Sequence, residues 1–392
     1  MKDISEREFQ LPDAVIGKLL KIVNSRKDVI SLGPGEPDFD TPKPILRKAS
    51  KILSSYKKNR VTHYSSPQGT IELREAVAKK LKKFNKINVL PENIAVGCGT
   101  QELIFTSLMS VLDPSEQVII PNPGYMGYVP AIELLNATPV SVQLKEENNF
   151  EINPDDIAKA VDKKKTRVIM LNTPSNPTGN VISKKILEEI ADIAVDNDLY
   201  VFADEAYEQL IYDDRKHVSI GSLNGMKKYV LTLQTFSKSY AMCGFRVGYC
   251  AGPDELIKAL CKCKDYTSIC APHFSQLLAV EALKFKDKFA IKMLKEYDRR
   301  RKMIVQRLNE MDLKTQMPHG AFYTFSNISK YSKNSWKFSE KLLEKGKVAV
   351  IPGTEFGKFG ESYIRCSFAT DYKKIEKAMD KIEVFLKKKQ YK

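Results

Sequence analysis

The sequence of 392 residues predicts an α/β fold, with a mostly parallel central sheet, helices on both of its faces and a smaller α+β domain. Two observations support this fold class. Short apolar runs, typical of strands buried on both faces, alternate with amphipathic helical stretches. The last third of the chain then changes character and becomes rich in charged helical patterns. We expect a large domain over residues 46–290, and a small domain that combines residues 1–45 and 291–392.

Six apolar runs are expected to form strands of the central sheet: residues 94–99, 117–122, 167–172, 199–204, 229–236 and 246–252. Helical patterns alternate with these runs, for example over residues 71–84 and 183–198. Strands that alternate with helices favour parallel pairing, since each crossover returns the chain to the same end of the sheet.

A long charged helix is expected from about His273 to Met311, and it leads from the large domain into the smaller one. Three apolar runs, "GAFYTF", "VAVIPG" and "SYIRCSFA", follow this helix, and an amphipathic helix from about Asp371 ends the chain. The turn-rich segment that includes "SLGPGEPDFDTP" is expected to pack against this domain.

Composition narrows the class of protein. With 43% hydrophobic and 28% charged residues, the chain is typical of soluble globular proteins. No apolar run approaches the roughly 18 residues that span a bilayer, and the charged N-terminus lacks the apolar core of a signal peptide. We therefore expect a cytoplasmic protein without membrane association.

The net charge of +15 and the seven cysteines raise two further possibilities, nucleic-acid binding and metal binding. The basic residues are spread along the chain without interleaved aromatics, so we expect no nucleic-acid partner. The cysteines are odd in number and scattered, which argues against a secreted disulfide framework. The pair Cys261 and Cys263 lacks a second pair nearby, so no metal is expected.

Candidate functional residues follow the predicted strands, where ligands of open α/β sheets bind. The turn Gly97–Gln101 leads from the first strand into a helix, and its backbone N–H groups suit a phosphate. It could equally be a plain glycine turn with Thr100 as the helix cap. The loop "NTPSNPTG" presents two amides, Asn172 and Asn176, at the same edge.

Asp204 stands directly behind four apolar residues, a position that is costly for a carboxylate unless it meets a cation. Tyr207 follows three residues later. Capping of the next helix would also explain Asp204. Lys238 is flanked by small and apolar residues, so desolvation could lower its pKa and make it a nucleophile. The alternative is a lysine that reaches solvent, with Arg246 as a separate surface charge.

Together these residues specify one ligand. A phosphate would meet Gly99, Thr100, Ser237 and Arg246; a protonated ring nitrogen would face Asp204. A ring hydroxyl would lie near Asn176 and Tyr207, and a carbonyl would condense with Lys238. Pyridoxal 5′-phosphate has all four features.

The chain resembles the class I/II pyridoxal-phosphate-dependent aminotransferases of fold type I, the aspartate aminotransferase family, and most of all its archaeal aspartate or aromatic members. The resemblance covers nearly the whole chain. Its motifs occur in the order of the family: "SLGPGEPDFDTP", "HYSSPQGTIELREA", "NTPSNPTG", "ADEAYE", "FSKSYAMCGFRVGY", "GAFYTF" and "YIRCSFA".

The resemblance implies roles for matching residues. Lys238 would form the Schiff base and shuttle a proton, Asp204 would pair with the pyridinium, and Asn176 and Tyr207 would hold the 3-oxygen. The phosphate would be bound by Ser237, Arg246 and the Gly99, Thr100 and Gln101 backbone, with Tyr125 stacked on the ring. Arg365 would grip the substrate carboxylate, aided by Gly35 and Asn176. Tyr64 would reach the partner subunit's phosphate in a homodimer.

Some positions depart from the pattern of the family. Cys98 and Cys243 replace other small residues, and Phe245 replaces a common tryptophan. No dedicated cation for a distal substrate carboxylate is recognisable, so aspartate is not secured as the substrate.

The expected function is an aminotransferase that moves an amino group between an L-amino acid (aspartate or aromatic) and 2-oxoglutarate by ping-pong chemistry. A carbon–sulfur β-lyase of the same fold and a non-catalytic regulator are the alternatives. A lyase would release pyruvate and ammonia without a keto-acid acceptor.

Overall fold

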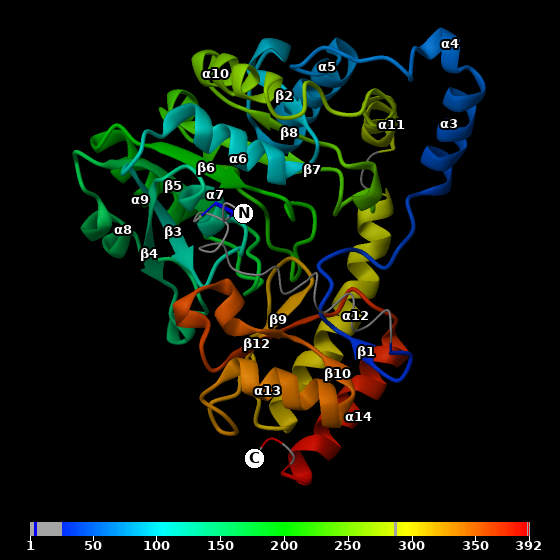
Figure 1. Ribbon diagram of the computed structural model, residues 1–392, viewed down its shortest axis with the longest axis vertical. Helices are drawn as coiled ribbons and strands as arrows, with labels where there is room; N and C mark the ends of the chain where they lie inside the picture. The colour runs from blue at the N-terminus through cyan, green and yellow to red at the C-terminus, as the bar shows by residue number, and fades with distance from the viewer. Residues whose placement is uncertain (1–3, 6–25, 286–287, 390, 392) are drawn as a thin grey trace.

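A computed structural model describes residues 4–5, 26–285, 288–389 and 391 of the chain (Figure 1). Its largest sheet has seven strands in the order β2-β8-β7-β6-β5-β3-β4. Within it, β8 runs antiparallel to both of its neighbours, and the other described pairs are parallel. The strands are β2 (Ile94–Gly97), β3 (Gln117–Asn122), β4 (Thr138–Gln143), β5 (Thr166–Asn172), β6 (Tyr200–Asp204), β7 (Val230–Thr235) and β8 (Gly248–Ala251).

Each of the six predicted runs overlaps one of these strands, so the expectation of a mostly parallel sheet is confirmed. The prediction omitted β4, which lies at the edge of the sheet. Its sequence, "TPVSVQ", alternates apolar and polar residues, and only Val142 is fully buried. An edge strand buries less of its surface, so it lacks the continuous apolar run that revealed the central strands.

Helices cover both faces of this sheet. Alternate residues of the strands point to opposite faces, so Met170 and Phe202 pack with α6 (Thr100–Val111), α7 (Tyr128–Glu133) and α10 (Asp254–Asp265). Ile169 and Val201 instead belong to the core formed with α8 (Pro154–Ala160) and α9 (Lys184–Asp196).

A third core lies beside β2 and β8. It is formed with α3 (Lys43–Ser54), α5 (Ile71–Lys80) and α11 (His273–Lys284), and α4 (Tyr56–Asn59) follows α3 at the edge of the molecule. The predicted helix over residues 71–84 is α5, which continues as a π-helical turn, Leu81–Asn85.

The predicted helix from His273 to Met311 is divided in the structure. The first helix, α11, ends at Lys284, and α12 (Lys288–Glu310) begins four residues later. The division has a packing reason, because α11 packs on α3 and α5, whereas α12 packs on α14 (Tyr372–Lys387) and β9 (Tyr323–Asn327). One straight helix could not pack on both sets of neighbours.

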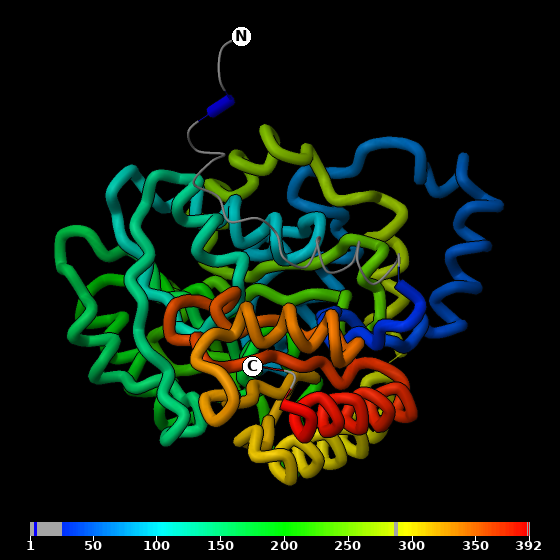
Figure 2. Tube along the Cα trace, turned by 60° about the horizontal axis from the view of Figure 1, so that its bottom comes forward, coloured from blue at the N-terminus to red at the C-terminus, as the bar shows by residue number. Residues whose placement is uncertain are grey.

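A smaller α+β layer lies below the large sheet in Figure 1. Its antiparallel sheet has the order β11-β12-β9, with β11 (Ile351–Pro352) and β12 (Tyr363–Ser367). Strand β1 (Ile30–Ser31) pairs in parallel with β10 (Val348–Ala349), so this part of the N-terminal segment joins the smaller layer. Figure 2 shows α13 (Ser335–Lys341), α12 and α14 side by side around it.

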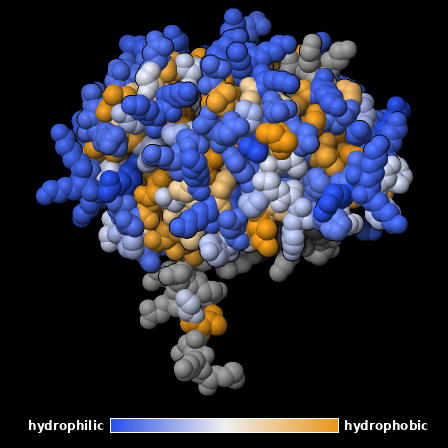
Figure 3. Space-filling model, turned by 90° about the horizontal axis from the view of Figure 1, so that it is seen from above, coloured by the Kyte–Doolittle hydropathy of each residue, from blue (hydrophilic) through white to orange (hydrophobic). Residues whose placement is uncertain are grey.

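The surface is mixed in character. On the face seen in Figure 3, hydrophilic residues cover most of the area, and apolar residues form separate groups between them. Among the described helices, none is long and apolar enough to cross a membrane.

Candidate active site

A pocket opens at the carboxyl ends of the parallel strands. Asn172 is the last residue of β5, Asp204 of β6 and Thr235 of β7, and all three line it. Parallel strands bring their carboxyl ends to one edge, which explains why residues distant in sequence meet there. Nine predicted residues line the pocket: Thr100, Gln101, Tyr125, Asn176, Asp204, Tyr207, Ser237, Lys238 and Arg246.

One end of the pocket suits an anion. Gly99 precedes α6 with a φ of +85°, and a Cβ placed there would lie 2.6 Å from Nη2 of Arg246. Arg246 donates to two backbone carbonyls, from Nη1 to Cys243 at 3.0 Å and from Nη2 to Cys98 at 3.3 Å. A helix N-terminus, a guanidinium and the Ser237 side chain therefore converge on a place that matches a phosphate.

Asp204 lies deeper in the pocket and is buried. Its Oδ2 accepts a hydrogen bond from the Tyr128 hydroxyl at 2.8 Å, and its Oδ1 accepts from the Ala206 N–H at 3.2 Å. Burial raises the pKa of this carboxyl to about 6, although Tyr128 and the nearby Lys238 act in the opposite direction. A carboxyl in this setting would be stabilised as the anion by a cationic ligand, such as a protonated ring nitrogen.

Tyr207 and Lys238 form the next wall. The Tyr207 hydroxyl lies 2.8 Å from the hydroxyl of Tyr323, and burial raises the pKa of Tyr207 well above its usual range. The Lys238 ammonium donates to the Gly35 carbonyl at 2.5 Å and lies 5.8 Å from the centre of the Tyr207 ring.

Arg365, on β12, is fully buried behind these residues. Nη1 donates to Oδ1 of Asn176 at 3.0 Å, Nη2 donates to the Gly33 carbonyl, and Nε has no hydrogen-bond partner among the described residues. Burial lowers the pKa of the guanidinium, and none of the ion pairs in the described part of the chain includes it. A buried cation without a carboxylate is costly, so the arrangement suits an anionic ligand.

Two predicted residues have other positions. Gly35 lies beside the pocket, and a Cβ there would approach the Tyr323 hydroxyl to 2.6 Å. Tyr64 is 78% exposed and does not line the pocket of its own chain.

Sequence reasoning missed Tyr128 and Tyr323 as members of this site. Tyr128 stands three residues after Tyr125, and Tyr323 lies within the motif "GAFYTF". Nothing in these motifs tells which aromatic side chain meets a polar partner, because that depends on how distant strands pack.

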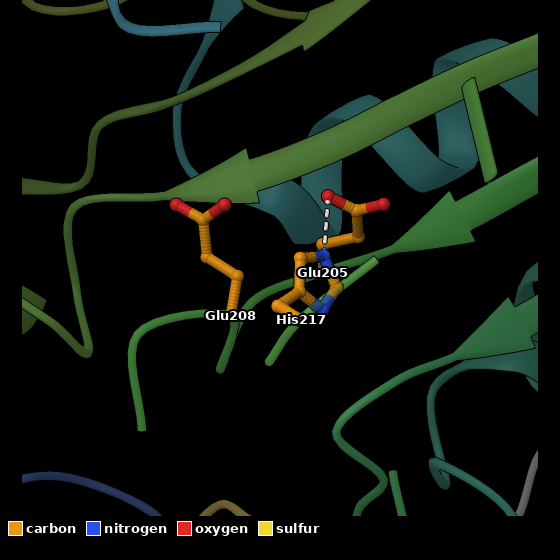
Figure 4. Close-up of side chains that lie close together, drawn as sticks. All are labelled: Glu205, Glu208 and His217. Atoms are coloured by element: carbon orange, nitrogen blue, oxygen red, sulfur yellow. Dashed lines mark ion pairs between the residues drawn. The ribbon is translucent and has the colours of Figure 1, made fainter. Parts of the chain in front are cut away.

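A second polar cluster lies just outside the pocket, with Glu205, Glu208 and His217 close together (Figure 4). Their possible ligand atoms lie within 4.8 Å of one another. The Glu208 oxygens and Oε2 of Glu205 accept hydrogen bonds, whereas Oε1 of Glu205 and both ring nitrogens of His217 have no hydrogen-bond partner among the described residues. Glu208 pairs with the Lys80 ammonium and accepts from the Asn85 amide at 2.6 Å. Nε2 of His217 lies 3.0 Å from Glu205. The donors that surround these carboxylates indicate a buried hydrogen-bond network, so we assign no metal to it.

The chain is similar to known proteins in both sequence and fold. Residues 27–382 match the family model for aminotransferase class I and II. The chain is 46% identical to an aspartate aminotransferase of Pyrococcus abyssi, over 98% of this chain and 99% of that protein. It is 42% identical, over 98% and 99% of the two chains, to aromatic-amino-acid aminotransferase 2 of Thermococcus litoralis.

Among solved structures, the Pyrococcus protein-A1 superposes with a TM-score of 0.94 at 45% identity, covering 99% of both chains. The aspartate aminotransferase of Thermus thermophilus with maleate superposes with a TM-score of 0.92 at 32% identity, covering 98% of this chain and 100% of that one.

Proposed function

The chain belongs to the aminotransferase class I and II family, and from this premise we propose its substrates, cofactor and catalytic residues. It is an aminotransferase. We propose that it exchanges an amino group between an L-amino acid, aspartate or aromatic, and 2-oxoglutarate, with pyridoxal 5′-phosphate as cofactor. The observation that carries the proposal is the pocket in which Lys238, Asp204 and Arg246 converge. The named activities of the Pyrococcus abyssi and Thermococcus litoralis relatives support the substrate class.

The residues present fit this cofactor. Arg246, Ser237 and the N-terminus of α6 would hold its phosphate, and the close approach of Arg246 to Gly99 leaves no room for a side chain there. Asp204 would face the ring nitrogen, and Asn176 and Tyr207 would hold the 3-oxygen. When bound, the cofactor supplies an electrophilic carbonyl and a ring that accepts the electrons of the bond broken at the substrate α-carbon.

Lys238 has two duties in this proposal. Its amine would be the group that holds the cofactor between turnovers, and once free it would take the proton from the substrate α-carbon. Asp204 would keep the proton on the ring nitrogen, since a buried carboxylate strongly favours a cation beside it. The Gly35 carbonyl, which accepts from the Lys238 Nζ, orients the amine toward the pocket.

Arg365 would bind the substrate α-carboxylate. The guanidinium is already oriented by Asn176 and by the Gly33 carbonyl, so little side-chain entropy is lost when a carboxylate arrives. Because the same site accepts first the amino acid and then the keto acid, the reaction follows a ping-pong order.

We also propose the wider organisation. The large cofactor domain comprises residues 46–290, and the pairing of β1 with β10 supports a small domain of residues 1–45 and 291–392. Exposure of Tyr64 is consistent with a homodimer in which it reaches the partner's phosphate. The seven free cysteines agree with the reducing cytoplasm.

The test is a set of single half-reactions of the purified protein, followed by visible absorption, with aspartate, aromatic, branched and sulfur amino acids. An aminotransferase converts the cofactor spectrum once per site and recovers it on addition of 2-oxoglutarate. Release of pyruvate and ammonia without a keto acid would instead indicate the β-lyase. The relatives at 40–46% identity are aminotransferases, so neither the lyase nor the non-catalytic regulator is favoured.

A further inference from the structure

Tyr323 lies behind the pocket, and its hydroxyl contacts Tyr207, one of the residues that line it. Tyr323 is fully buried on β9, and its hydroxyl lies 2.8 Å from that of Tyr207. Its ring lies 4.4 Å below the guanidinium carbon of Arg365. The backbone of Gly35 passes so close that a Cβ there would meet the Tyr323 oxygen at 2.6 Å. One side chain thus contacts the cofactor wall, the carboxylate-binding arginine and the N-terminal segment.

The direction of the hydrogen bond between Tyr207 and Tyr323 has a consequence for the cofactor. Each phenol carries one proton, and both phenols are buried, so one hydroxyl donates and the other accepts. The other charged or titratable groups that face Tyr207 are Asp204, Lys238 and Arg365. If Tyr207 donated to Tyr323, it would have no proton left for the cofactor. If Tyr323 donates, the Tyr207 proton is free to point into the pocket.

We propose that Tyr323 is a positioning residue, whose hydroxyl donates to Tyr207 and thereby holds the Tyr207 proton toward the 3-oxygen of the cofactor. This inference rests on the proposed function. A hydroxyl that accepts one hydrogen bond becomes a better donor in the next, so Tyr323 also strengthens the bond that Tyr207 makes.

The ring of Tyr323 has a separate task. The stack of Arg365 on this ring is buried, and Phe356 lies on the guanidinium as well, 5.0 Å away. A desolvated cation–π contact fixes the plane of the guanidinium and so directs its fork toward a carboxylate. The hydroxyl therefore acts on the cofactor, and the ring acts on the substrate.

Two variants separate the role of the Tyr323 hydroxyl from that of its ring. Each is compared with the unaltered protein, with cofactor bound. Tyr323→Phe keeps the ring but removes the hydroxyl. We expect the midpoint pH of the visible absorption change of the cofactor to rise by about 0.5–1 unit, a 3- to 10-fold change in proton affinity, because the charged 3-oxygen loses part of its donor. Its affinity for maleate should stay within about two-fold. Tyr323→Leu should shift the midpoint similarly and also weaken maleate binding by about 10-fold.

The matched control is Tyr212→Phe, which removes a buried phenol that donates to the Ala321 carbonyl at 2.6 Å. It should leave both readouts unchanged. In a Tyr207→Phe background, Tyr323→Phe should add no further shift, since Tyr323 acts through Tyr207. An unchanged midpoint in Tyr323→Phe, a shift of equal size in Tyr212→Phe or additive shifts in the double variant would each overturn the proposal. A protein that binds no cofactor at all would overturn the proposed function instead, and this inference with it.

Discussion

The Nη1 group of Arg365 donates to Oδ1 of Asn176 at 3.0 Å and so joins residues 189 positions apart. Arg365 lies on a strand of the smaller layer, and Asn176 lies on the loop after β5 of the large sheet. The proposed carboxylate site therefore spans both layers, and the amide oxygen of Asn176 holds the guanidinium in place before any ligand arrives.

The first prediction follows from this contact. Arg365→Lys keeps the charge but loses the planar fork, so we expect KM for the amino acid to rise about 10- to 100-fold with a smaller change in kcat. Steady-state kinetics with saturating cofactor provide the measurement. If substrate affinity proved normal, the carboxylate would have to bind elsewhere.

Lys238→Ala should abolish turnover, with a loss of at least about 10⁴-fold, because no other lysine of the described residues lines the pocket and could move the α-proton. Cofactor binding itself should persist through Arg246 and the N-terminus of α6. Lys184→Ala, at a lysine of an exposed ion pair on α9, is the control and should be fully active. Near-normal turnover in Lys238→Ala would refute the assignment.

Asp204 should make the cofactor-free protein less stable as pH rises. Its folded pKa, about 6, lies above the usual value of 3.8, so the folded state retains this proton where the unfolded state has released it. The contribution of Asp204 to the free energy of unfolding is therefore largest below pH 4. It falls by roughly 2–3 kcal/mol as pH rises through 6. Urea unfolding of the cofactor-free protein between pH 4 and 7 measures the slope.

Asp204→Asn is the matched variant for that titration, since it removes the ionisable group but keeps the shape. Its unfolding free energy should lack this part of the pH dependence. Identical slopes in the two proteins would mean that the carboxyl titrates normally.

Gly99→Ala should weaken cofactor affinity about 10-fold or more, because the new methyl group would displace the Arg246 guanidinium from the phosphate. Gly225→Ala is the control, since Gly225 has a similar φ of +82° but nothing within 4 Å of the added carbon. Both variants thus strain the backbone, but only Gly99→Ala displaces Arg246. Equal cofactor affinity in the two, measured by equilibrium dialysis, would contradict the role of Arg246.

Lys80→Met should destabilise the protein by about 3–5 kcal/mol, because it leaves the buried carboxylate of Glu208 without its cation. Lys184→Met removes an exposed partner of Glu188 and should cost less than about 0.5 kcal/mol. Chemical denaturation of both variants compares the two. A small effect at Lys80 would show that the amides of Asn85 and Gln234 satisfy Glu208 by themselves.

The site could be predicted to a large extent from sequence, because its polar residues directly follow strands that are recognisable as apolar runs. Asp204 and Asn172 end their strands, and Lys238 follows the end of β7 by three residues. Parallel strands bring such positions together in any fold of this class, so their convergence required no knowledge of side-chain packing.

Other features had no such local signal. Edge strand β4 carries an alternating pattern, and the break between α11 and α12 lies within a continuous helical pattern. Both depend on which neighbouring layer covers each segment.

The sequence by itself determined most strands and helices of the large sheet, the polar residues at the strand ends and the family to which they point, since these depend on local patterns. Tertiary structure alone decided that Tyr128 meets Asp204, that Tyr323 meets Tyr207 and that Arg365 donates to Asn176. It also decided that Arg365 has no carboxylate partner among the residues that the structure describes. The physical reason is that a buried polar group must find its partner across the fold, and sequence distance says nothing about which partner the packing provides.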